Sequence, residues 1–131
     1  MQLFSANPWE GVLVAVGVLR KAGGELVCER CELADTPRKR MWGLLGRAGL
    51  DEGEGMLFRP AGSIHMFFMR FTIDAVFCDG DLVVVGVERH LKPWKTARRK
   101  GAKVVIELAA GAAAALEPGD RLLLEAATMN S

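Results

Sequence analysis

The sequence is poor in the residues and motifs that usually mark an enzyme. It has no tyrosine, two histidines and three cysteines in 131 residues, and only 7% of the residues are aromatic. It contains no GxSxG, no HExxH and no phosphate-binding glycine loop, which excludes the hydrolase, zinc-protease and nucleotide-binding signatures that these motifs carry. We therefore expect no cofactor, no bound metal and no catalytic set.

Long apolar runs and paired cysteines are also missing. The longest apolar run, Gly11–Leu19, has nine residues, whereas a membrane-spanning helix needs about twenty. Glu10 precedes this run and no basic residue does, which is unlike a signal peptide. Because an odd number of cysteines fits a reducing compartment better than a disulfide framework, we expect a cytoplasmic protein without a membrane partner.

What the sequence does contain is typical of one globular domain. Half of the residues are hydrophobic, a quarter are charged, and the formal net charge is +1. A chain of this length forms one domain and buries roughly two-thirds of its unfolded surface. With so small a net charge, any preference for an anionic partner has to come from local clustering.

Short strand-like segments separated by turns run through the chain. Asp35 or Thr36 can cap a helix that has Pro37 in its first turn, and the alanine-rich residues 109–117 can form one or two helical turns. Pro118 and Gly119 fit the centre of a type II turn. The pattern predicts a mainly β (α+β) single domain, a mostly antiparallel half-open β-barrel with one or two short helices. The expected strands are residues 12–20, 25–33, 56–60, 64–70, 73–78, 82–90, 103–108 and 121–126.

Residues 62–81, "GSIHMFFMRFTIDAVFCDGD", combine an apolar run with three polar side chains, His65, Arg70 and Asp74. Successive side chains of a strand point to opposite faces, so an unbroken strand would hold His65 and Asp74 apart. The apolar run is too long for one typical strand of five or six residues. We therefore expect a break near Thr72, with His65 at a rim and "MFFM" contributing mainly to the core.

Five segments in order, "RMWGLLGRAGLDEGEGMLF", "SIHMFFMRFTIDAVFCD", "HLKPWK", "VIELAAG" and "EPGDRL", resemble the domain-of-unknown-function 192 family of small bacterial and archaeal proteins. The resemblance covers about Val18 to Ala126 and implies a single small β-rich domain, residues 18–131, after an extension or first strand at residues 1–17. It implies no established activity. Thr72 departs from the proline that is common in the family. The matching positions are Gly43, Gly55, Met56, His65, Phe67, Met69, Asp74, Gly111, Gly119 and Asp120.

The unusual residues cluster on one strand and one loop without forming a catalytic set. We therefore expect a non-enzymatic binding or accessory module, whose partner is a small anionic ligand or a protein, and which is a monomer or a homodimer. A cleft with apolar walls and a few polar groups at its mouth is the usual form of such a site. The expected ligand-binding residues are His65, Phe67, Met69, Arg70, Asp74, Trp94 and Lys95.

Two other functions fit the same residues. One is a hydrolase-like enzyme with His65 as general base, oriented by Asp74. The other is nucleic-acid binding through Arg89–Lys103, which holds seven Lys or Arg, no acidic residue, and Trp94. The plain alternative for this basic segment is a solvated loop that offsets the acidic turns.

The motif "CERC", Cys28 to Cys31, raises the question of a metal or redox site. Residues three apart in a strand face opposite ways, which opposes chelation and a disulfide. A zinc site that combines these cysteines with Cys78, His65 and His90 would be the alternative. We interpret the cysteines as packing residues.

Overall fold

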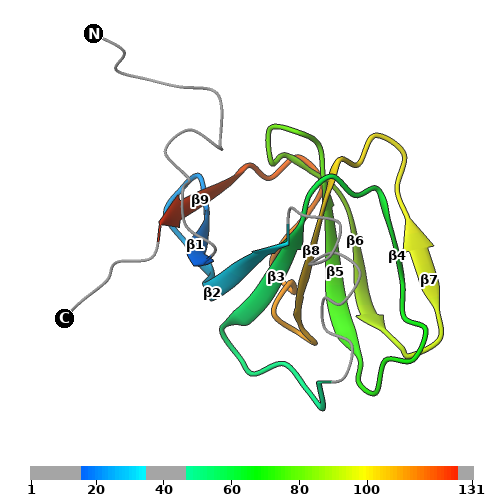
Figure 1. Ribbon diagram of the computed structural model, residues 1–131. Coiled ribbons are helices and arrows are strands. Elements are labelled where there is room, and N and C mark those ends of the chain that lie inside the picture. The colour runs from blue at the N-terminus through cyan, green and yellow to red at the C-terminus, as the bar shows by residue number, and fades with distance from the viewer. Residues whose placement is uncertain (1–15, 35–46, 127–131) are drawn as a thin grey trace, which may run out of the picture.

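The computed structural model describes residues 16–34 and 47–126, and these residues form strands and turns without a helix (Figure 1). They therefore contain no helix long and apolar enough to cross a membrane. The helix expected after Asp35 falls almost entirely outside the described residues. The strands are β1 (Val16–Lys21), β2 (Leu26–Ala34), β3 (Glu54–Phe58), β4 (Ser63–His65), β5 (Ile73–Cys78), β6 (Val84–Leu91), β7 (Thr96–Arg98), β8 (Val104–Ala109) and β9 (Leu122–Ala126).

Seven of the strands form one curled sheet in the order β6-β5-β8-β3-β2-β1-β9. All neighbours are antiparallel except β2 and β3. The two edges of the sheet meet at one end through a bridge between Val83 and Arg121, next to a hydrogen bond from the Leu122 N–H to the Leu82 carbonyl. The predicted half-open, mainly antiparallel barrel is confirmed.

The sheet has a hydrophobic core on each face. The inner core lies inside the curl and contains Val76, Ile106 and Leu108, whereas the outer core contains Ala75, Phe77 and Val105. All six residues of β5 are buried. Because side chains alternate along a strand, β5 and β8 supply apolar residues to both cores and require cover on both faces.

The second sheet, the β4–β7 ribbon, helps to cover the outer core (Figure 1). Its paired residues Ile64 and Ala97 pack against that core, whereas the next pair, His65 and Thr96, is exposed. The strand expected over residues 64–70 is wrong beyond His65. The predicted break is present, but it extends from residue 66 to residue 72.

A series of turns carries the chain from β8 to β9. Gly119 has a φ of 97°, and the Asp120 N–H donates to the Glu117 carbonyl, so the predicted type II turn is confirmed. Residues 109–117 do not form the expected helical turns. They form successive i→i+3 turns, of which Leu116 N–H to Ala113 carbonyl is one. Gly111 interrupts this segment with a φ of 95°, which a right-handed helix does not allow.

Glu107 is the exception to the apolar outer core. It pairs with Met56 on β3 and with Ala75 on β5, both residues of that core, and its side chain is almost fully buried. Its Oε2 atom has no hydrogen-bond partner among the described residues. Burial raises the pKa of Glu107 from 4.5 to about 8, because the charged carboxylate is poorly solvated there. The side chain is therefore protonated at neutral pH.

Replacement of Glu107 by glutamine should flatten the pH dependence of stability. Between pH 4.5 and about 8 the folded chain keeps a proton that the unfolded chain releases, so the free energy of unfolding falls as pH rises. The fall is about 1.4 kcal/mol per pH unit. Urea unfolding of the parent and Glu107→Gln at several pH values measures this slope, and equal slopes in the two proteins would contradict the assignment.

Candidate functional site

The segment Met66–Met69 alternates between core and solvent in a way that no strand would produce. The side chains of Met66 and Met69 are buried in the outer core, with 0% and 8% exposure, whereas Phe67 and Phe68 are 41% and 71% exposed. The expectation that "MFFM" is mainly core is therefore correct for the methionines and wrong for the phenylalanines. The methionines anchor a loop that presents two aromatic rings to solvent.

The backbone of Met66 joins this loop to the segment that carries Trp94. The Met66 carbonyl accepts hydrogen bonds from the N–H groups of Trp94, at 2.7 Å, and Met69, at 3.2 Å. The Met66 N–H donates to the Lys95 carbonyl at 2.7 Å. Two segments almost thirty residues apart in the sequence are thus held together at the end of the β4–β7 ribbon.

Four rings, His65, Phe67, Phe68 and Trp94, form a continuous exposed cluster that we call the aromatic ledge. The centroids of His65 and Phe67 are 4.8 Å apart, those of Phe67 and Trp94 6.1 Å, and those of Phe68 and Trp94 4.9 Å. Trp94 is 58% exposed. Exposed clusters of large apolar side chains usually mark an interaction site.

Two residues of the aromatic ledge have an unfavourable backbone conformation. Phe68 has a φ of 65° and Trp94 a φ of 71°, in the left-handed region that bulky residues seldom adopt. Such a conformation costs on the order of 1–3 kcal/mol and is concentrated at functional sites. The two residues with this backbone conformation are also the two most exposed aromatic residues among those described.

Positive charge is concentrated in the two segments that carry the aromatic ledge. Residues 62–73 and 91–103 contain seven Lys or Arg and no Asp or Glu, which leaves a net charge of −6 for the rest of a chain whose net charge is +1. Six of these side chains are exposed, and none of the six forms an ion pair with a described residue. They are Arg70, Lys92, Lys95, Arg98, Lys100 and Lys103.

Asp74 lies in the interior of the protein, where it accepts backbone hydrogen bonds, and not on the aromatic ledge. It is completely buried, and its Oδ1 accepts a hydrogen bond from the His90 N–H at 2.9 Å. Its Oδ2 accepts bonds from the N–H groups of Gly111 and Ala113, both at 3.0 Å. One carboxylate therefore ties the end of β6 to the turns that follow β8.

The pairing of His65 with Asp74 that the hydrolase alternative requires is not seen among the described residues. Asp74 alternates with Ala75 on β5, so it lies on the inner face of the sheet with Val76, whereas His65 lies on the exposed side of the ribbon that covers the outer face. No described hydrogen bond joins the two side chains. The geometry gives the hydrolase hypothesis no support.

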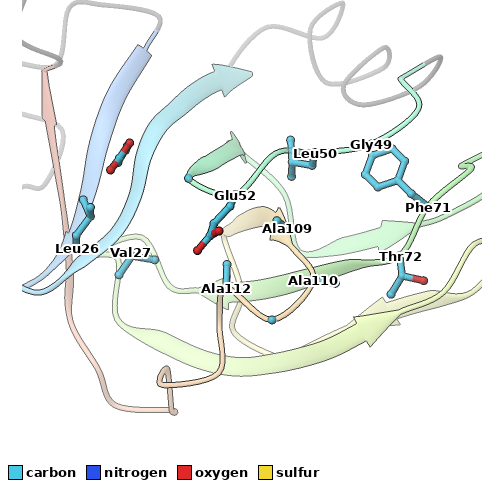
Figure 2. A pocket seen from close by; sticks show the side chains of 13 residues that line it. Leu26, Val27, Gly49, Leu50, Glu52, Phe71, Thr72, Ala109, Ala110 and Ala112 are labelled. Carbon is cyan, nitrogen blue, oxygen red and sulfur yellow. The ribbon is translucent and has the colours of Figure 1, made fainter.

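A pocket with a volume of about 990 Å³ opens beside the ends of β3 and β8. Figure 2 shows Leu26 and Val27 on one side, Phe71 and Thr72 on the other, and Glu52 between them. Its lining includes residues 109–112, next to the amide groups that Asp74 binds. Asp74 thus helps to fix the backbone that forms one wall of this pocket. Phe71 and Thr72, which also line the pocket, follow the aromatic ledge in the sequence.

The two cysteines of "CERC" lie on the same face of the sheet, contrary to the alternation of side chains expected for a regular strand. From Cys31 to Cys28, β2 advances three residues while its partner β1 advances two, from Gly17 to Leu19. This bulge turns both side chains into the inner core, so the expectation of opposite faces is wrong. A hydrogen bond between the thiols lowers the pKa of Cys28 and raises that of Cys31.

The packing interpretation of the cysteines agrees with their burial, and Cys78 lies in the same core. Within the part of the chain that the structure describes, no three His, Cys, Asp or Glu side chains are placed to hold a metal ion. His65, a member of the hypothetical zinc set, lies on the aromatic ledge instead.

Of the predicted ligand-binding residues, the structure brings His65, Phe67 and Trp94 together and places Lys95 beside them in the chain. Arg70 is exposed in the loop that follows, whereas Met69 and Asp74 are buried. The site residues predicted from the sequence do not include the exposed Phe68 or the buried Glu107. The signal for Phe68 was the length of the apolar run, which is too long for one strand, but nothing in the sequence distinguishes Glu107 from a solvated strand residue.

Replacement of Asp74 by alanine should destabilise the protein by on the order of 3–5 kcal/mol, because three N–H groups, two part-buried and that of Ala113 buried, lose their acceptor. Asp74→Asn keeps one acceptor oxygen and should have an intermediate effect. Urea unfolding measures stability, and amide hydrogen exchange should quicken at Gly111 and Ala113. If Asp74 instead served the aromatic ledge, Asp74→Asn would shift the NMR ring signals of His65 and leave these amides protected.

Two known proteins are similar to this chain in sequence. A UPF0127 protein of Thermococcus sibiricus is 34% identical over 72% of this chain and 64% of its own length, so the chain spans less than two thirds of that relative. A UPF0127 protein of Pyrococcus abyssi is 35% identical over 71% of this chain and 84% of its own.

Two crystal structures have the same fold. One, from Sinorhizobium meliloti 1021 and described as a "putative transcription regulator", has a TM-score of 0.74 and 26% identity, and the match covers 84% of this chain and 94% of that one. A protein of unknown function from Novosphingobium aromaticivorans has a TM-score of 0.67 and 25% identity over 82% of each chain. The family model DUF192, "Uncharacterized ACR, COG1430", matches residues 18–124. The chain therefore belongs to the DUF192 family.

Proposed function

We propose that this protein is a non-enzymatic binding module that holds a polyanionic partner on the aromatic ledge and the surrounding cations. The observation that carries the proposal is the exposure of Phe68 and Trp94 on strained backbone, within two segments that contain no carboxylate. The rings provide contact area with few rotatable bonds, and the cations attract negative charge.

The position of the surface supports this function. The ledge lies at the end of the ribbon and is held by the backbone hydrogen bonds of Met66, so its rings are positioned before a partner arrives. Asp74 and Glu107 are buried, and Glu88 pairs with Arg99 at 2.7 Å, so none of these three carboxyl groups pairs with the six exposed cations. A polyanion is therefore attracted to the exposed cations of these two segments.

Removal of two cations beside the ledge, in Lys92→Ala/Lys95→Ala, should weaken binding of fluorescently labelled heparin roughly tenfold at low salt, because each exposed cation contributes about 0.7 kcal/mol. Fluorescence anisotropy measures the affinity. Arg30→Ala/Arg121→Ala is the matched control, since it removes two exposed cations far from the ledge. Equal losses in the two variants would show that the ribbon has no special role.

The two strained aromatic residues should be dispensable for folding. In Phe68→Gly and Trp94→Gly the relief of positive-φ strain offsets the lost ring contacts, so the free energy of unfolding should stay within ~1 kcal/mol of the parent. Met66→Ala, which empties a buried site, should cost about 2–5 kcal/mol. Urea unfolding compares the three variants, and a loss at Phe68 or Trp94 as large as that at Met66 would assign the rings a structural role.

A further inference from the structure

We infer that the polyanion bound by the aromatic ledge is a single-stranded nucleic acid, whose bases stack on the exposed rings of Phe68 and Trp94 while its phosphates contact the cations of the ribbon. This inference rests on the proposed function and specifies its partner. Single-strand binding sites combine these two elements, aromatic rings for the bases and a basic track for the backbone.

The chemical nature of the exposed apolar groups favours stacking. Among the described residues, the large hydrophobic side chains that are exposed at the ledge are Phe67, Phe68 and Trp94, all aromatic. The aliphatic residues of the same region, Ile64, Met66 and Met69, face or lie in the outer core. Planar rings present the flat faces on which unpaired bases stack.

The cations are arranged along the ribbon rather than around a point. Lys92 and Lys95 flank Trp94, and Arg98 follows on the same exposed side of β7 as Thr96. Lys100 continues the series past the end of β7. An extended row of charge beside a cluster of rings matches an extended phosphate chain better than a compact anion, which would need convergent groups.

The rings are also placed for access by unpaired bases. Phe68 is 71% exposed and Trp94 58%, so each retains a free surface although their centroids are 4.9 Å apart. Bases within a duplex are stacked on one another and do not offer their faces. The inference therefore includes a preference for single strands over duplexes.

The test compares an oligothymidylate about ten nucleotides long, within the ~4–16 nucleotide range of single-strand sites, with an abasic oligomer of equal length and charge. Fluorescence anisotropy of the labelled oligomers measures affinity for the full chain. The base-bearing oligomer should bind at least ~10-fold tighter, the free-energy equivalent of one stacked base. Its affinity should fall with salt at a log–log slope of roughly −2 to −3, for three or four phosphate contacts.

The variants separate stacking from charge. Trp94→Ala should lose roughly tenfold in affinity for oligothymidylate and leave the abasic oligomer unaffected, whereas Trp94→Phe, which keeps a ring, should retain most of the binding. Leu26→Ala is the control, since Leu26 is 48% exposed but lies away from the ledge. A duplex of the same length should bind more weakly than the single strand.

Three results would overturn the inference. Equal affinity for the abasic and base-bearing oligomers would mean that only charge is recognised, and the proposed polyanion-binding function would stand without a nucleic acid. Binding to phosphatidylserine-containing vesicles that depends on Phe68, without binding to the oligomer, would assign the ledge to a membrane surface. Absence of binding to heparin, to both oligomers and to vesicles would remove the proposed function as well.

Discussion

The apolar character of β5 and β8 on both faces is the constraint on which the rest of the structure depends. Every residue of β5 is buried, and its side chains alternate between the two cores. The inner face is covered because the sheet curls until Val83 and Arg121 pair, but a curled sheet does not cover its own outer face. The β4–β7 ribbon performs this second task with Ile64 and Ala97. Because the ribbon is a single thin layer, its other side faces solvent, and there the chain carries the aromatic ledge.

Two buried carboxyl groups on neighbouring strands differ in the hydrogen bonds that the local backbone offers them. Asp74 and Glu107 are both buried in the centre of the sheet, on opposite faces. Asp74 lies at the end of β5, where three N–H groups point at its oxygens. Glu107 lies within β8, where the ladder uses the neighbouring N–H groups, and burial without a partner raises its pKa to about 8. The backbone thus supplies three donors to one buried carboxyl group and leaves an oxygen of the other without a described partner.

Most of the fold could be predicted because it follows from local rules. The strand periodicity and the Pro118–Gly119 turn depend on residues close in sequence, and both are present. The failures occurred where tertiary contacts override alternation. The bulge of β2 turns Cys28 and Cys31 to one face, and the anchoring of Met66 and Met69 replaces an expected strand by a loop. Part of the site can also be predicted from the sequence, since His65, Phe67 and Trp94 do converge. The burial of Asp74 and the exposure of Phe68 depend on contacts with residues distant in the sequence: Asp74 binds the N–H groups of Gly111 and Ala113, and Phe68 contacts Trp94.

The small net charge of the chain conceals an uneven distribution of charged residues. That distribution restricts how a charged partner can approach. Residues 62–73 and 91–103 contain seven cationic side chains, whereas the other residues of the chain have a net charge of −6. Over distances beyond the Debye length, about 8 Å at physiological salt, the two regions act separately. The exposed cations of these two segments lie in the same part of the chain as the exposed rings of Phe68 and Trp94, whose backbone is strained. A chain selected for stability alone would gain by burying these rings or replacing them with glycine, so strain and charge at one place are better explained by recognition than by folding.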